Sequence, residues 1–125
     1  MIVKLPTISK TWNEETNQVE VTKSEIAVDI DTSFKAHLKW EEQFQSTVGY
    51  SLSTYTDMVS EWIKDPNNAK ARLVGYIKLL YCYINSDKLP TFKDFAGLFD
   101  FEVADEISNK IKIVLEEVGK TASKN

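Results

Sequence analysis

The sequence predicts a mainly α fold: a compact bundle of about five helices preceded by an N-terminal β-hairpin or extended arm. Three observations predict it. In residues 1–31, apolar side chains mostly alternate with polar ones, which is the period of a half-buried strand. From residue 32 onward, apolar residues recur at helical spacing. Residues 73–84, which read LVGYIKLLYCYI, form an almost continuous apolar segment with the pattern of a largely buried helix.

The predicted arm comprises residues 1–31. The alternating apolar residues of its second half are Val19, Val21, Ile26, Val28 and Ile30. Residues 2–8 suggest an earlier strand, which Pro6 restricts to an edge or irregular position, and polar residues 13–17 suggest a hairpin loop. A two-stranded ribbon is only marginally stable alone. The arm must therefore lie on the helices, pair with another subunit, or stay mobile.

The predicted helical body comprises residues 32–119. Its first helix has candidate N-caps at Asp31, Thr32 and Ser33. The predicted apolar face of this helix consists of Phe34, Leu38, Phe44 and Val48. Gly49 is the expected end of the helix, because glycine is the usual residue at that position.

Four further helices are expected. The second begins near Ser51 or Ser53 and ends before Pro66, because proline disfavours helical geometry in the residue that precedes it. The third covers about residues 69–84. Thr91 can cap a short fourth helix with Asp94 three residues later. The last helix carries an apolar stripe that Gly119 closes, and residues 120–125 are expected to form a mobile polar tail.

The third helix has an unusually wide apolar surface. At ~100° per residue, its large apolar side chains cover an arc roughly twice the ~100° that a one-sided surface helix needs. Its aliphatic stripe consists of Leu73, Ile77, Leu80 and Ile84, and Tyr76, Leu79 and Tyr83 widen one shoulder. The helix must be covered on several sides, either by its own domain or by a partner.

Composition excludes several classes of function. The chain has 125 residues, enough for one domain with a real core, and its net charge is -4. Residues 66–99 carry a local basic excess, but Arg72 is the only arginine, so nucleic-acid binding is not expected. Residues 73–84 are too short and too charged at their flanks to span a bilayer, so no membrane contact is expected.

The residues also argue against catalysis. His37 is the only histidine, and its place beside the first apolar face favours a structural role over that of a base. Cys82 is the only cysteine, which rules out an intramolecular disulfide and a zinc site of the usual spacing. The glycines are isolated and form no phosphate-binding loop. The sequence therefore predicts no enzyme activity, no cofactor and no metal.

Protein binding is the remaining function. Trp12 lies in the polar part of the arm, and Trp40 falls off the predicted Phe34/Leu38/Phe44 face. A partly exposed tryptophan can anchor an interface, or it can fold back over its own domain. The shoulder of the third helix can likewise face a partner or pack inside the body. The candidate interaction residues are Trp12, Val19, Val21, Ile26, Val28, Trp40, Tyr76, Leu79 and Tyr83.

The chain resembles the tail assembly chaperones of long-tailed bacteriophages, of the type found in lactococcal phages. The resemblance rests on the strand-to-helix passage of residues 26–34, on residues 39–44, and on the central helix of residues 73–84. Residues 91–95, TFKDF, followed by a long helix, also fit. The match covers most of the chain as an architecture.

The resemblance implies a specific role. Such chaperones are small, mostly helical proteins of the host cytoplasm that are absent from the finished virion. They bind the hydrophobic tape-measure protein, keep it soluble, help tail-tube subunits polymerise around it, and form homo-oligomers. The resemblance supplies no catalytic residues. The alternative is a small helical adaptor, such as another phage morphogenesis or host-takeover factor, that binds one folded partner.

Overall fold

The computed structural model describes residues 1–85 and 90–123, and it has a mixed α and β fold. The predicted mainly α class is wrong, because 59% of the model is helical and 22% is strand. The physical reason is the length of the two strands: β1 (Ile2–Asn13) and β2 (Gln18–Asp29) have 12 residues each and pair over their whole length. The more detailed description, a helical bundle preceded by a hairpin, fits the structure.

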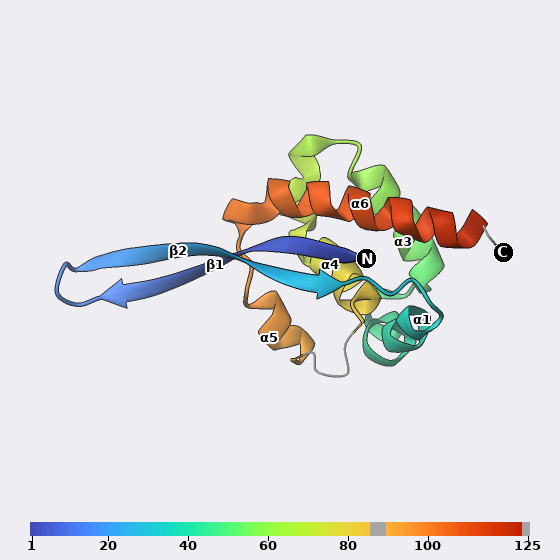
Figure 1. Cartoon of the computed structure of the whole chain (residues 1–125), viewed down its shortest axis with the longest axis horizontal. Helices are drawn as coiled ribbons and strands as arrows, with labels where there is room; N and C mark the ends of the chain where they lie inside the picture. The colour runs from blue at the N-terminus through green and yellow to red at the C-terminus, as the bar shows by residue number, and fades with distance from the viewer. Residues whose placement is uncertain (86–89, 124–125) are drawn as a thin grey trace.

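The helices follow the hairpin in the predicted order. The longer ones are α3 (Leu52–Trp62), α4 (Ala69–Tyr83) and α6 (Ala104–Ser123). The shorter elements are α1 (Lys35–Trp40), the π-helical turn η1 (Glu41–Gln45), α2 (Ser46–Val48), the 3-10 turn η2 (Pro66–Asn68), α5 (Phe92–Ala96) and the 3-10 turn η3 (Phe101–Val103). Figure 1 shows β1 and β2 as a long twisted ribbon that runs along the helices and extends past them at one end.

Local signals account for most helix ends. The side chains of Ser51 and Thr91 each accept a hydrogen bond from the backbone N–H three residues later, which caps α3 and α5 as predicted. Gly49, in the left-handed conformation with φ +88°, ends α2. The predicted end of the last helix is wrong, because α6 continues through Gly119 to Ser123. Residues 124–125 of the predicted tail lie outside the described residues.

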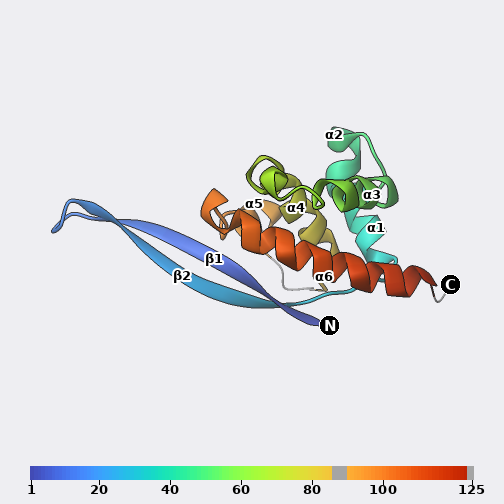
Figure 2. The same ribbon diagram turned by 90° about the horizontal axis from the view of Figure 1, so that it is seen from above.

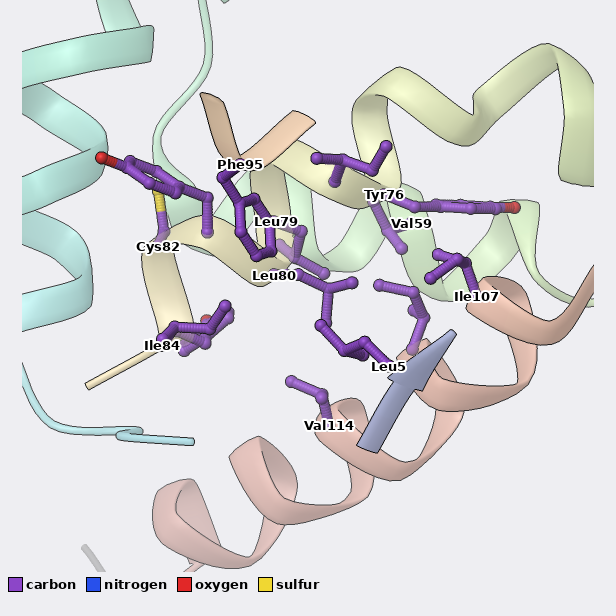
Figure 3. Close-up of a cluster of buried hydrophobic side chains, with 14 of the residues drawn as sticks. Leu5, Val59, Tyr76, Leu79, Leu80, Cys82, Ile84, Phe95, Ile107 and Val114 are labelled. Carbon is purple, nitrogen blue, oxygen red and sulfur yellow. The ribbon is translucent and has the colours of Figure 1, made fainter. Parts of the chain in front are cut away.

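The core lies between α4, α6 and the base of the hairpin. Seen from above, α6 lies between the ribbon and the other long helices (Figure 2). Leu5 of β1 is fully buried and reaches in among Leu80 of α4 and Val114 of α6 (Figure 3). The end of α4 also joins the hairpin, because Ile30 and Ile84 form an isolated antiparallel bridge. The base of the arm therefore lies on the helices, the first of its three predicted alternatives.

Gly75 of α4 lies where the aromatic side chains of α3 press against this helix. A Cβ atom at this position would collide with the Tyr55 hydroxyl and touch the Trp62 ring. We expect Gly75→Ala to destabilise the fold by about 1–3 kcal/mol from overpacking. This cost exceeds the gain in helix propensity, which is about 1 kcal/mol. Urea unfolding followed by circular dichroism measures the change.

Gly119 of α6 is the matched control for this substitution. A Cβ atom there would meet nothing within 4 Å, so Gly119→Ala should raise the free energy of unfolding by up to about 1 kcal/mol through helix propensity alone. The two substitutions are expected to have opposite signs. Equal stabilisation by both would contradict the close packing of α3 on α4.

Candidate functional site

Three exposed apolar side chains share one face of the hairpin near its turn. Trp12 pairs directly with Val19 across the two strands, and Val21 lies two residues further along β2 on the same face. Their exposed fractions are 54% for Trp12, 54% for Val19 and 48% for Val21. We call these three side chains the tip patch. The turn end of the hairpin extends past the helices (Figure 1).

The turn that closes the hairpin is built by asparagine. The Asn13 side-chain oxygen accepts hydrogen bonds from the backbone N–H groups of Glu15 and Thr16 at 2.9 and 3.3 Å. Asn17 adopts the left-handed conformation with φ +56°, which asparagine tolerates better than most residues. This turn holds the register that places Trp12 opposite Val19.

Lys10 attaches the hairpin to the helical body next to the tip patch. Its ammonium group lies 2.8 Å from carboxylate oxygens of both Asp100 and Glu102. The hydrogen bonds to Asp100 and Glu102 raise the pKa of Lys10, and the bond from Lys10 lowers the pKa of Asp100. The Ile8 N–H also donates to the Leu98 carbonyl at 2.9 Å. The strands are therefore held at Ile8 and Lys10. Val21 of the tip patch lies opposite Lys10, and the Trp12–Val19 pair lies two residues further toward the turn.

Only part of the predicted interaction set is accessible. Trp12, Val19 and Val21 are exposed, and Ile26 is partly buried against the core. The structure does not bring the remaining five to a surface. These core residues are Val28, Trp40, Tyr76, Leu79 and Tyr83.

Trp40 is fully buried, so its prediction as a partly exposed anchor is wrong. Its indole N–H donates to the Tyr50 carbonyl at 2.8 Å, and its ring packs against Phe44 and Tyr55. At ~100° per residue, Phe44 lies about 40° from Trp40 but about 120° from Leu38. The buried face is therefore centred on Trp40 and Phe44.

Two other members of the predicted first apolar face are largely exposed, whereas Val48 is partly buried against the core. Phe34 and Leu38 each have more than half of their surface accessible. Phe34 stacks on His37 with 5.6 Å between ring centroids, which is a structural contact for this histidine. The small residue Ala36 is buried on this helix, together with Trp40.

The aromatic shoulder of α4 belongs to the core. Leu79 and Tyr76 are fully buried, and burial raises the pKa of Tyr76. Tyr83 is also buried, and its hydroxyl lies 3.2 Å from the Thr56 hydroxyl of α3. These side chains face α3 and α6 rather than a partner. Of the two alternatives for the shoulder, packing inside the body is the one found, because neighbouring helices cover the wide apolar arc. Tyr76, Leu79 and Tyr83 are therefore not surface residues.

A second apolar surface was not predicted from the sequence. Between α4, α5 and η3 runs a groove lined by Leu73, Val74, Ile77, Phe92, Phe99 and Phe101. Val74 and Phe101 are 57% and 56% exposed. One sequence feature could have indicated that this side of α4 is exposed. Val74 lies between Lys70 and Lys78, each one helical turn away, and charged residues at this spacing are typical of a solvent-facing stripe. We call this feature the α4–α5 groove.

A partly buried lysine near Cys82 has a structural role. The Lys39 ammonium donates to the carbonyls of Tyr81 and Ile84 at 3.1 and 3.0 Å, which satisfies the last carbonyl groups of α4. Burial lowers the pKa of Lys39 and raises the pKa of the Cys82 thiol to about 12. The thiol is therefore protonated at neutral pH and is a poor nucleophile.

Residues 1–85 and 90–123 contain neither a metal-binding cluster nor a membrane-spanning helix. In these ranges no group of three or more His, Cys, Asp or Glu side chains is placed to hold a metal ion. None of the described helices combines the length and the apolar character needed to cross a membrane.

Comparisons with protein-family models, with curated proteins and with solved structures found no match to this chain. The tip patch and the α4–α5 groove are both apolar and partly exposed, which is typical of protein-binding surfaces.

Proposed function

We propose that this protein binds other proteins through the tip patch and acts as a tail assembly chaperone of a long-tailed bacteriophage. In this role it binds and solubilises the hydrophobic tape-measure protein in the host cytoplasm and self-associates during tail morphogenesis. The tail-tube protein is a second candidate partner. It acts by binding and not by catalysis. The observation that carries the proposal is the apolar tip patch, held beyond the helices by Lys10.

The size of the patch favours a long client over a single contact. Complete burial of a large apolar side chain contributes about 1.5–3 kcal/mol. The three side chains of the patch are already about half covered, so their burial contributes roughly 2–4 kcal/mol in total. Association entropy opposes this by at least about 4 kcal/mol. One tip patch therefore binds weakly, and a long client is kept soluble by many copies that bind independently along its length.

A second candidate function is that of an adaptor for one folded partner. The observation in its favour is the two-stranded sheet, in which each strand has one outer edge. An outer edge can pair with a strand of a folded partner and thereby extend a sheet. This mode requires one defined partner and a fixed stoichiometry.

Co-expression with a tape-measure protein tests the chaperone function. The wild-type chain is expected to keep this client in the supernatant after lysis. The triple variant Trp12→Ser, Val19→Thr, Val21→Thr should lose most of this effect, because it removes the apolar side chains while keeping strand-compatible residues. The solubilised fraction of the client is measured by gel densitometry.

Phe34→Ser is the matched control, since it removes an even more exposed aromatic side chain far from the turn in sequence. It should leave client solubility unchanged. Circular dichroism should show native folding for both variants. Equal solubilisation by the triple variant would contradict the proposal, and a fixed 1:1 complex with a folded protein would favour the adaptor.

A further inference from the structure

The α4–α5 groove has the chemistry to receive the hairpin tip. Its walls are apolar, and the exposed side chains Val74 and Phe101 lie at its surface. The tip patch offers one aromatic and two β-branched side chains on a narrow ribbon. A two-stranded ribbon that carries apolar residues on one face is a suitable shape for an open apolar groove.

The charges of the two surfaces are complementary. Residues 11–22 contain Glu14, Glu15 and Glu20 and no lysine or arginine. Lys70 and Lys78 lie one turn before and one turn after Val74 on α4. Asp100 also lines the groove, but its carboxylate is paired with Lys10. Two lysines outside the groove lining therefore flank its α4 wall, whereas the hairpin tip is acidic.

The geometry of the hairpin favours binding of the tip patch to a groove on another molecule, not on its own chain. Lys10 and Ile8 hold the strands against the residues around η3 of their own chain, and the turn projects away from the helices (Figure 2). A rigid ribbon held in this way presents its tip patch to the surroundings.

We propose that the tip patch of one copy docks in the α4–α5 groove of a second copy, with Glu14 and Glu15 near Lys70 and Lys78. The partner is thus another molecule of this chain. The inference rests on the proposed function, whose self-association it assigns to two definite surfaces. The contact is head to tail, because it joins two different surfaces. Each added copy leaves one tip and one groove open, so assembly continues into a ring or a filament.

This arrangement also gives the assembly a regulatory property. The tip patch is the proposed client site, so docking covers it in the absence of client. A client that binds the tip must displace the groove of the neighbouring copy. Self-association and client binding are therefore competitive, and the client is expected to dissolve the assembly.

Two variants and their mixture test the contact. Val74→Glu places a negative charge in the groove, and the triple tip variant removes the apolar side chains of the ribbon. Each alone is expected to weaken self-association about tenfold or more in sedimentation equilibrium, because burial of an unpaired charge or loss of apolar area is unfavourable. Mixed together, they should form a one-to-one heterodimer, since one variant retains a tip and the other a groove.

The mixture separates docking from misfolding, because only folded variants can complement each other. Ile113→Glu, at an exposed apolar position of α6, is the matched control and should associate like the wild type. Raising the salt concentration should weaken wild-type association by screening the charges around the groove. Undiminished association of Val74→Glu, or a mixture that stays monomeric, would overturn the proposal.

Client binding distinguishes failure of docking from failure of the chaperone function. Val74→Glu keeps the tip patch and should still solubilise the tape-measure protein as a monomer. If the mixture forms its heterodimer but no variant or wild-type protein solubilises the client, the docking contact stands and the chaperone function fails. If Val74→Glu solubilises the client but still associates, the docking contact fails and the chaperone function stands.

Discussion

Replacing Trp40 with alanine is expected to lower the free energy of unfolding by about 3–5 kcal/mol. The indole is fully buried between Phe44 and Tyr55, so its removal leaves a large cavity. The substitution also takes away the N–H donor that satisfies the Tyr50 carbonyl. Urea denaturation followed by far-ultraviolet circular dichroism measures the loss without depending on tryptophan fluorescence.

Two further variants separate the contributions at this site. Trp40→Phe keeps an aromatic ring but loses the donor, so it should cost less than Trp40→Ala. Leu38→Ala, on the same helix, removes an exposed side chain and should change stability by no more than about 0.5 kcal/mol. If Trp40→Ala were as mild as Leu38→Ala, the indole would be a surface anchor and the buried assignment would be wrong.

Leu5→Ala is expected to destabilise the whole fold by about 2–5 kcal/mol. Leu5 belongs to the hairpin in sequence, but its side chain is fully buried among residues of α4 and α6 (Figure 3). The resulting cavity would open at the point where strand and helices meet. Unfolding of the hairpin and of the helices should therefore shift together, which thermal melts followed by near- and far-ultraviolet circular dichroism can measure.

Ile2→Ala is the control for this prediction, because Ile2 is an exposed aliphatic residue of the same strand. Its substitution should leave the midpoint nearly unchanged. Hydrogen exchange adds a local readout. If Leu5→Ala increased exchange only in residues 1–29 and left α4 and α6 protected, the hairpin would be an independent arm.

The sequence predicted the elements well where the signal is local. The side chains of Ser51 and Thr91 cap helices as expected, and Gly49 ends one. These signals work because a cap needs only its own side chain and a backbone group three residues away. The hairpin also follows from local alternation and a polar loop, although its full length was not evident.

The candidate site was predicted only in part. Trp12, Val19 and Val21 are exposed together, because strand alternation and register place them on one face beyond the helices. Trp40 and Tyr76 were also named as candidate interaction residues, but both are buried. Aromatic side chains are common both in cores and at interfaces, so their residue type does not distinguish the two. The α4–α5 groove was missed because its residues come from segments that meet only after folding.

The sequence by itself determined the kinds of element, most of their ends and the acidic, tryptophan-bearing tip of the hairpin. These features depend on residues close together in the chain. Only the tertiary structure decided which apolar surfaces are covered: it buried the shoulder of α4 under neighbouring helices and left Phe34, Val74 and Phe101 exposed. The physical reason is that burial depends on which distant segments arrive at a surface. A helix whose apolar arc is wider than one-sided packing requires can therefore belong to the core. A small apolar patch on a ribbon can remain available for binding.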